Sequence, residues 1–461
     1  MTLMLGDTHM KTTLQTCAGV LAAAGASFGS LADPVVDANA NAAAAALATC
    51  IAPTDNPLHE SRMYAMTHLA IHDALNAIQR RSRPYAYDAT APAGASPEAA
   101  VAAATRDVLV SQIARIGAPF PPVCIAAGIA RAEADYSATL ATIPNSAAKT
   151  LGVDLGRAAA AAIIARRAND GSDTLLADVN YPQGTAIGEW RFTPGSPQIS
   201  FATGWGSVTP FALRSAAQFL PPAPSAVECE GQRPNNADGC RTYARDYEEV
   251  RRLGSDAVSA PSARTPEQTQ IALYWVESSP LAWNRIARTA SMSQALDPWE
   301  NARLFALLNV ALTDGYIANW VTRFQYKRWR PVTAIREGDR DNNPLTTGDP
   351  NWMSLAPTPP IPEYESGHSL EGAAAAQVLK RVFRRDSIAF SNCSYTLPAS
   401  QRCGEPGAVL RSYRSFSEAE KENGESRIFV GFHFRGSVEA GLKHGGQVGE
   451  WTVDQILRWE R

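Results

Sequence analysis

Basic side chains recur at helical spacing between residues 320 and 331. Arg323, Lys327 and Arg330 lie in one segment that ends at Pro331, where we expect the helix to stop. Seven residues at about 100° each return a side chain to within about 20° of the same helix face. Guanidinium groups bind tetrahedral oxyanions through paired N–H donors. The segment therefore indicates an oxyanion site, although a solvated basic helix face would show the same spacing.

Ser366, Gly367 and His368 stand between a proline-rich run at 359–362 and an alanine run at 373–376. The alanine run predicts a helix, and a serine just before a helix is a common N-cap. The first N–H groups of a helix lack intrahelical partners and favour an anion. The segment is therefore a second candidate anion site, with an N-cap serine and an incidental histidine as the simpler alternative.

A third segment places Arg427 six residues before His433. On an ideal helix, six residues put two side chains about 120° apart. A bend, for example at Gly431, is needed if both side chains face one site. Taken alone, His433 would more simply be a buried core histidine.

Charge and composition limit the class of protein. The 461 residues carry 42 Lys+Arg and 45 Asp+Glu, a net charge of −3, which excludes a strongly basic nucleic-acid binder. With 45% apolar and 19% charged residues, the chain is typical of a globular protein. Length alone suggests two or three domains of about 150 residues. No internal repeat or clear linker divides the chain, so we expect a single domain over 33–461.

Periodic apolar residues predict a mostly helical chain. Helical periodicity is strongest at 60–79, 97–116, 125–143, 147–168, 265–276, 300–322, 368–384, 415–430 and 436–459. Residues 33–49 could be a short helix or a loose tail. We expect extended loops near 198–202 and 207–213, and surface loops at 82–97 and 217–239. The predicted fold class is all-α, a single large helical-bundle domain with long loops.

Residues 1–32 have the pattern of a secretory signal peptide. Lys11 supplies the positive charge, 17–28 the apolar stretch, and 30–32 a small-x-small cleavage site. The apolar stretch is shorter than the roughly 20 residues of a membrane span. We therefore expect a secreted or periplasmic protein with no membrane span.

Removal of residues 1–32 leaves six of the seven cysteines. An even count in an exported chain favours disulfides. Two local pairs enclose short loops and the third pair follows by elimination: Cys229–Cys240, Cys393–Cys403 and Cys50–Cys124. A structural zinc site is not expected, because no paired-cysteine motif with zinc spacing occurs.

The order of the three segments is more specific than any one of them. They read Arg-Pro at 330–331, Ser-Gly-His at 366–368, and Ser-Arg at 426–427 followed by His433. This set resembles the signature shared by vanadium-dependent haloperoxidases and type 2 phosphatidic acid phosphatase-like acid phosphatases. Further segments resemble the bacterial haloperoxidase branch: 68–78, 204–213, 264–269 and 330–336. The resemblance covers most of 55–455 and implies a helical fold with the oxyanion site inside a bundle.

The resemblance implies vanadate as cofactor, with phosphate able to occupy the same site. Arg330 and Arg427 would bind the equatorial oxygens, and Ser366 and the Gly367 N–H would add hydrogen bonds. An anion with two or more charges needs several cations and donors in a closed pocket.

The two histidines would do the chemistry. His433 would be the axial ligand of vanadium, and His368 the acid–base residue. The implied reaction oxidises a halide with hydrogen peroxide to hypohalous acid, which can then reach an organic substrate. Whether the chain forms a homodimer is left open.

Three positions depart from the family pattern. Arg323 replaces a lysine; it keeps the charge but not the compact ammonium, and Lys327, one turn on, is a candidate for that role. Ser437 replaces an aspartate, which would leave His433 without an orienting partner. Glu365 replaces a proline, and its carboxylate opposes anion binding unless it points away.

Two other functions are possible for the same pocket. The same pocket could serve an acid phosphatase with His433 as nucleophile, or an inactive oxyanion-binding relative. His68 and His72 stand four residues apart, but with no third ligand nearby we expect them to pack structurally. Trp320 could line the halide pocket or belong to the core.

Overall fold

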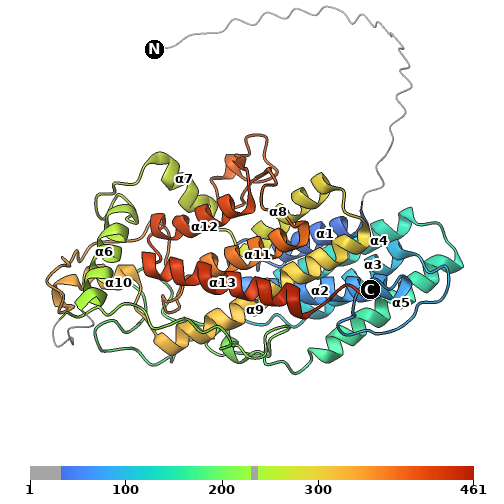
Figure 1. Cartoon of the computed structure of the whole chain (residues 1–461), viewed down its shortest axis with the longest axis horizontal. Helices are drawn as coiled ribbons and strands as arrows, with labels where there is room; N and C mark the ends of the chain where they lie inside the picture. The colour runs from blue at the N-terminus through green and yellow to red at the C-terminus, as the bar shows by residue number, and fades with distance from the viewer. Residues whose placement is uncertain (1–32, 230–236, 461) are drawn as a thin grey trace, which may run out of the picture. The chain divides into compact units, whose positions relative to one another are not determined.

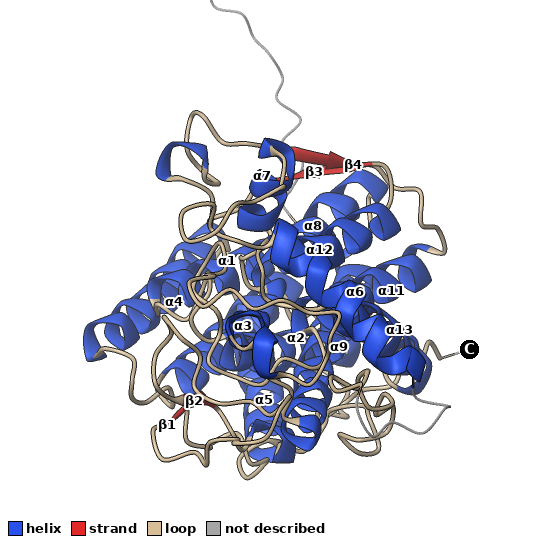
Figure 2. Ribbon diagram, turned by 90° about the vertical axis from the view of Figure 1, so that its left-hand side faces the viewer, coloured by secondary structure: helices blue, strands red, loops and turns tan. Residues whose placement is uncertain are grey.

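The computed structural model describes residues 33–229 and 237–460, and Asp33–Arg461 forms one compact unit. The expected signal segment, residues 1–32 with Cys17, lies outside the described residues. The described part of the chain contains thirteen α-helices and only four short strands (Figure 2). The predicted all-α class is therefore confirmed.

Polar side chains cap four of the five N-terminal helices. Their bounds are α1 Pro34–Ala48, α2 Pro57–Ile78, α3 Pro97–Ile113, α4 Pro122–Thr142 and α5 Ala147–Arg166. The side chains of Asp33, Asn56, Ser96 and Ser146 accept N–H groups in the first turns of α1, α2, α3 and α5. Proline, which needs no N–H partner, opens each of α1 to α4.

The long helix α9, Pro298–Tyr326, is the central element of the fold. It starts at a capping box in which Asp297 and Glu300 bond reciprocally to the backbone. It packs against α2, α11 and α13 (Figure 1). Among the described residues it alone is long and apolar enough to cross a membrane, yet 94% of its most apolar window is buried inside the protein. Residues on all its faces are therefore core residues.

Seven further α-helices complete the described part of the chain. They are α6 Ala237–Leu253, α7 Pro266–Tyr274, α8 Ser279–Gln294, α10 Pro331–Arg336, α11 Gly367–Phe383, α12 Phe416–Phe429 and α13 Arg435–Gln455. Short 3₁₀ turns lie at Trp205–Ser207, Gly338–Arg340 and Ala399–Gln401. All nine windows with helical periodicity contain a helix. The periodicity missed α6, α8 and α10, and α1 is the helix left open at residues 33–49.

Glycines bring α13 into close contact with α11. Gly441, Gly445 and Gly449 recur one turn apart on α13. A Cβ at Gly445 would lie 2.0 Å from the carbonyl oxygen of Leu370, and one at Gly441 would lie 2.6 Å from that of Ser366. Only glycine allows this approach, which places the start of α11 directly against α13.

The strands form two small antiparallel pairs. Ala177–Asp178 (β1) pairs with Ser200–Phe201 (β2), and Phe390–Asn392 (β3) with Arg411–Tyr413 (β4). The three predicted disulfides are all present: Cys50–Cys124, Cys229–Cys240 and Cys393–Cys403.

Candidate functional site

The basic segment does not form one continuous helix face. α9 ends at Tyr326, and Lys327 follows in a left-handed backbone conformation with φ 44°. Arg330 is extended and caps α10, whose first residue is Pro331. The prediction that the helix would continue to Arg330 is therefore wrong. Pro331 starts a new helix instead of ending the old one.

Contacts with a distant loop explain this break. The N–H of Trp190 donates to the carbonyl of Lys327 at 2.6 Å, and the N–H of Trp329 donates to the carbonyl of Gly188 at 2.9 Å. These bonds hold the link between α9 and α10 as an extended segment. Sequence periodicity carries no signal for such a tertiary pairing.

The structure separates Lys327 from the other two cations. Its side chain is exposed, whereas the side chains of Arg323 and Arg330 are buried. The suggestion that Lys327 takes over the role of the family lysine is therefore wrong. The residue ends α9 and lies near the exposed carboxylate of Glu189.

Arg323 braces the segment that precedes Ser366. Its Nε donates to Oδ1 of Asn319 at 2.5 Å, and its Nη1 donates to the carbonyls of Pro362 and Glu363, the latter at 3.1 Å. Nη2 lies 3.2 Å from where a Cβ at Gly367 would stand. Arg323 therefore holds the backbone of the site and presents one nitrogen toward the start of α11.

Ser366 caps α11 as predicted. Its buried Oγ accepts from the N–H of Ser369 at 3.4 Å and from the hydroxyl of Ser369 at 2.8 Å. Because Oγ accepts both bonds, its own proton remains available for an external acceptor. The N–H of Gly367, the first residue of α11, points out of the helix end in the same region. Together they provide two donors for an anion.

A bend after α12 brings Arg427 and His433 to the same site. α12 ends at Phe429, and Gly431 follows with φ 84°. The N–H of His433 then turns back to the carbonyl of Arg427 at 3.3 Å. A Cβ at Gly431 would lie 2.4 Å from the carbonyl oxygen of Gly254, so glycine is required. The predicted bend at Gly431 is confirmed.

Three buried guanidinium groups share the site without a carboxylate on any of them. Within the described ranges, no salt bridge involves Arg323, Arg330 or Arg427. Burial, and then repulsion from Arg323 and Arg427, lowers the pKa of Arg330 well below its usual value. Burial lowers the pKa of Arg323 to about 10 and that of Arg427 to about 9, so both stay charged at neutral pH.

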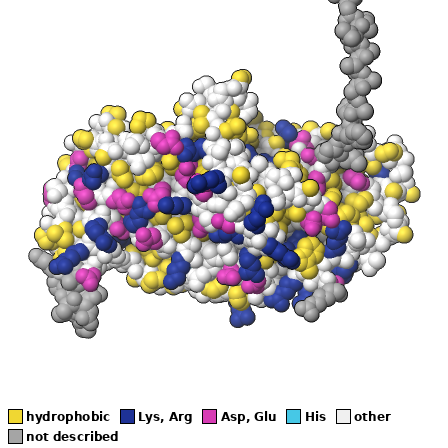
Figure 3. Space-filling model, turned by 45° about the horizontal axis from the view of Figure 1, so that its top comes forward, with side chains coloured by type: hydrophobic (Ala, Val, Ile, Leu, Met, Phe, Trp, Pro, Cys, Tyr) yellow, Lys and Arg dark blue, Asp and Glu magenta, His cyan; other side chains and the backbone are white. Residues whose placement is uncertain are grey.

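Unpaired donors mark where an anion would bind. The Nη2 atoms of Arg330 and Arg427 are buried and have no hydrogen-bond partner among the described residues. Buried charged donors are costly unless a partner satisfies them. A tetrahedral oxyanion supplies both charge and acceptors, so the residues fit such a group. On the face drawn in Figure 3, by contrast, Lys and Arg are interspersed with Asp and Glu.

Both site histidines are neutral at neutral pH. Burial, followed by the charge of Arg330, lowers the pKa of His433 well below its usual value. Burial and Arg427 do the same to the pKa of His368. Nε2 of His368 lies 3.0 Å from the carbonyl oxygen of Glu277, which can only accept. His368 therefore carries its proton on Nε2 and keeps a lone pair on Nδ1.

The other residues singled out in the sequence, His68, His72 and Trp320, are buried inside the fold. His72 bonds to Asp73 at 2.9 Å and Ser82 at 2.7 Å, while His68 bonds to Asn39 at 2.8 Å, so the two histidines share no ligand site. Among the described residues no group of three metal-ligating side chains occurs. Trp320 is buried in an apolar cluster with Trp205 and Tyr316, and Cζ of Arg323 lies 5.8 Å from the centre of its ring.

Sequence reasoning missed Glu363, the hydrogen-bond partner of His433. Oε1 of Glu363 lies 2.9 Å from Nδ1 of His433, although 70 residues separate them. The signal that could have found it is indirect. A histidine that lacks its expected carboxylate at Ser437 needs another, and Glu363 stands in the proline-rich run before Ser366.

Known proteins are similar to this chain in sequence and in fold. Residues 303–459 match the family model for the VCPO second helical-bundle domain. Vanadium chloroperoxidase from Curvularia inaequalis is 27% identical over 299 residues, which cover 52% of this chain and 47% of that protein. This chain therefore aligns with about half the length of that curated relative.

Solved structures extend the likeness to almost the whole fold. A bacterial vanadium-dependent iodoperoxidase superposes with a TM-score of 0.72 at 22% identity, covering 93% of this chain and 98% of that one. An apo-type bacterial vanadium-dependent chloroperoxidase gives 0.65 at 17% identity, covering 87% and 94%. The chain is therefore similar to vanadium-dependent haloperoxidases: residues 303–459 match the family model, and the whole unit has the helical fold of the solved structures.

Proposed function

We propose that the protein is a vanadate-dependent haloperoxidase that uses hydrogen peroxide to oxidise a halide to hypohalous acid. The observation that carries the proposal is the pair of unpaired, buried Nη2 atoms of Arg330 and Arg427 beside the neutral ring of His433. Similarity to the family model and to vanadium chloroperoxidase supports the same activity. Vanadate, when bound, supplies the Lewis-acidic centre at which peroxide is activated.

The chain's own donors would hold the oxyanion. Arg330 and Arg427 offer their free Nη2 atoms, and Ser366 offers its hydroxyl proton. The N–H of Gly367 adds a backbone donor at the positive end of α11. Arg323 supplies charge through Nη2 and holds the preceding backbone. Because these groups are fixed before an anion arrives, little reorganisation opposes binding.

The two histidines have different roles, one as ligand and one as acid–base residue. The single lone pair of Nε2 of His433 accepts from Nη1 of Arg330 at 3.1 Å, and this hydrogen bond would give way to the bond with vanadium when vanadate binds. Nδ1 of His368 keeps the other lone pair and would take the proton that peroxide loses. His368 is also less buried than the arginines and His433. We therefore propose that peroxide and halide reach the site from the side of His368.

Halogenation assays test this function. Protein incubated with vanadate should brominate or iodinate an organic acceptor only when peroxide is present. His368→Ala should lose about 10²-fold or more in rate, and Arg427→Ala a similar factor. Lys327→Ala, a change of an exposed cation, should keep the wild-type rate. No halogenation with vanadate supplied at mildly acidic pH would overturn the proposal.

The neutral Nε2 of His433 also favours a phosphatase as the second candidate. A neutral imidazole lone pair beside three guanidinium groups could attack a phosphate monoester and form a phosphohistidine. Acid-labile phosphate on wild-type protein, absent from His433→Ala, together with phosphate release, would favour this activity. Neither activity, with oxyanion binding intact, would identify an inactive oxyanion-binding relative.

We also propose that the protein works outside the cytoplasm, in the periplasm or as a secreted enzyme. Three disulfides support this location, because such bonds persist in oxidising compartments. Fractionation of the source cells, with amino-terminal sequencing of the mature chain, tests it. Uncleaved protein in the cytoplasm would contradict it.

A further inference from the structure

The two ring nitrogens of His433 have partners of opposite kinds. Nη1 of Arg330, 3.1 Å from Nε2, can only donate a hydrogen bond. Nε2 must therefore accept. In the neutral ring, Nδ1 then carries the proton and donates a hydrogen bond to Oε1 of Glu363, 2.9 Å away. The surroundings thus select one tautomer and one ring orientation.

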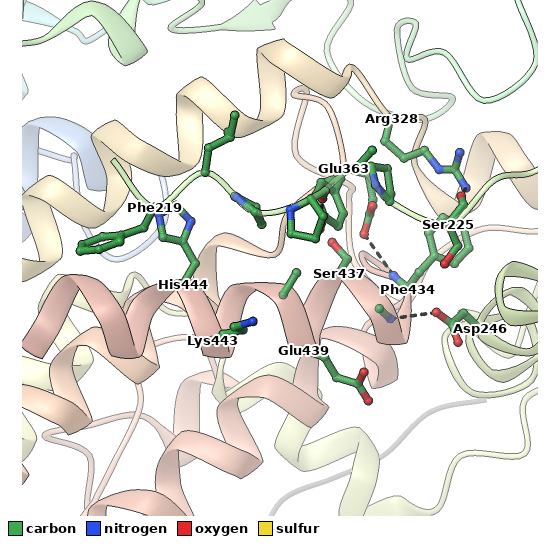
Figure 4. A pocket seen from close by; sticks show the side chains of 18 of the residues that line it. Phe219, Ser225, Asp246, Arg328, Glu363, Phe434, Ser437, Glu439, Lys443 and His444 are labelled. Atoms are coloured by element: carbon green, nitrogen blue, oxygen red, sulfur yellow. Dashed lines mark hydrogen bonds between the residues drawn. The ribbon is translucent and has the colours of Figure 1, made fainter. Parts of the chain in front are cut away.

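Glu363 is itself held in place by several bonds. Its backbone N–H donates to the carbonyl of Arg328 at 2.8 Å, and its carbonyl accepts from Arg323 at 3.1 Å. Its Oε1 also accepts from the N–H of Phe434 at 3.1 Å, as Figure 4 shows. The side chain is 1% exposed. A carboxyl group fixed in this way can act as a rigid support for the imidazole.

We propose that Glu363 is the positioning residue of His433, in place of the carboxylate that the family pattern puts at position 437. The inference rests on the proposed function to the extent that His433 is the vanadium ligand. A carboxylate on one ring nitrogen fixes the tautomer and makes the other nitrogen a better ligand. Glu363 performs this role from the segment before α11, whereas position 437 lies in α13.

A pocket beside Glu363 allows a test of whether a carboxylate at position 437 can replace the carboxylate of Glu363. The pocket has a volume of about 540 Å³, and its lining includes Glu363 and Ser437 but none of the three site arginines. Tyr326 and Tyr364 hold the proline-rich wall by bonds to the carbonyls of Pro221 and Pro222. Figure 4 shows Ser437 beside Glu363 at this pocket. An aspartate at position 437 therefore has space toward the pocket.

The first measurement is ¹⁵N NMR of the histidine ring nitrogens in vanadate-free protein, with His433→Ala used to assign the signals. Wild type should show His433 with Nδ1 protonated and Nε2 unprotonated. Glu363→Ala should leave Nε2 unprotonated, because Arg330 still donates to it, but should shift the Nδ1 signal, because Nδ1 loses its acceptor. Glu363→Ala with Ser437→Asp should restore the wild-type Nδ1 signal, and Glu363→Gln should stay close to it, because its amide oxygen can accept both N–H groups. An Nδ1 signal in Glu363→Ala that equals that of wild type would overturn the proposal.

The second measurement compares vanadate with sulfate, which binds without forming a bond to nitrogen. Glu363→Ala should weaken vanadate binding by about 10- to 100-fold, the range seen when a partner of a metal-binding histidine is removed. Sulfate affinity should change by less than about threefold, because the arginines remain. Adding Ser437→Asp should restore vanadate affinity. Glu439→Ala, which removes another carboxylate of the same pocket, should change neither.

Three outcomes separate the possible failures. Equal losses of vanadate and sulfate affinity in Glu363→Ala would show a merely structural role and overturn the proposal. Unchanged vanadate affinity would overturn it as well. If wild-type protein binds sulfate but not vanadate, the proposed function fails, while a Glu363-dependent Nδ1 signal in the NMR measurement would still support the positioning role.

Discussion

Nδ1 of His444 donates to Oε1 of Glu365 over 2.6 Å, and this bond ties the residue before Ser366 to α13. His444 lies on α13 and Glu365 just before α11, and both side chains are almost completely buried. The partner on α13 explains how the fold accommodates a buried glutamate directly before Ser366. The carboxyl therefore has a partner in the contact between α13 and the segment that leads into α11.

Loss of His444 should therefore reduce the stability of the fold. In His444→Ala the buried Glu365 carboxylate loses its partner, which should lower the free energy of unfolding by about 3 to 5 kcal/mol. Glu365→Gln combined with His444→Ala should lose less, because no buried charge remains unpaired. Chemical denaturation of the variants checks this. A double variant less stable than His444→Ala would contradict it.

Arg323→Lys should weaken the site even though it restores the residue type of the family pattern. Lysine cannot reproduce the bonds of Arg323 to Asn319 and to the carbonyls of Pro362 and Glu363. We expect a loss of about 1 to 3 kcal/mol in unfolding free energy. Sulfate affinity, measured by calorimetry, should fall as well.

The matched control for Arg323 is the exposed cation four residues on. Lys327→Ala should leave sulfate affinity unchanged, because its side chain is outside the site. A larger loss of sulfate affinity in Lys327→Ala than in Arg323→Lys would show that the assignment of the two cations is wrong.

Gly431→Ala should disrupt the bend that joins Arg427 to His433. A side chain there would adopt a left-handed conformation and collide with the backbone of Gly254. We expect a loss of about 2 to 5 kcal/mol in unfolding free energy, together with weaker sulfate binding. Gly446→Ala on α13 is the control, because its Cβ meets nothing within 4 Å. It should gain up to about 1 kcal/mol. Equal stability of the two variants would refute the prediction.

The buried carboxyl of Glu60 should make stability depend on pH. Its Oε2 accepts from Ser278 at 2.6 Å, its Oε1 has no partner among the described residues, and burial raises its pKa to about 8. Between its usual pKa near 4.5 and about 8, the folded protein keeps a proton that the unfolded chain releases. The resulting stabilisation is complete below the lower value and is lost as pH rises through the higher one.

Glu60→Gln isolates this effect. The free energy of unfolding of wild type should fall relative to the variant by up to about 1.4 kcal/mol per pH unit as pH rises from about 5 to 8. Urea denaturation at several pH values measures the difference. A constant difference over this range would show that the Glu60 carboxyl does not take up a proton on folding.

Local sequence signals predicted the elements but only part of the site. Ser366 could be placed at a helix start, and Gly431 at a bend, because N-cap preference and helical geometry are local. The end of α9 at Tyr326 could not be predicted, because backbone bonds from residues 188–190 create it. Glu363 and His444 were likewise invisible to periodicity. Each makes its decisive bond across 70 or more residues, and only the tertiary fold brings those partners together.

The most direct test of the account is a crystal structure of the protein grown with vanadate, with anomalous data to locate vanadium. The account predicts one vanadium atom bonded to Nε2 of His433. Its oxygens should contact Arg330, Arg427, the Ser366 hydroxyl and the Gly367 N–H, while Glu363 keeps its bond to Nδ1. Vanadium bound elsewhere, or a site that stays empty with vanadate in excess, would contradict the central claim.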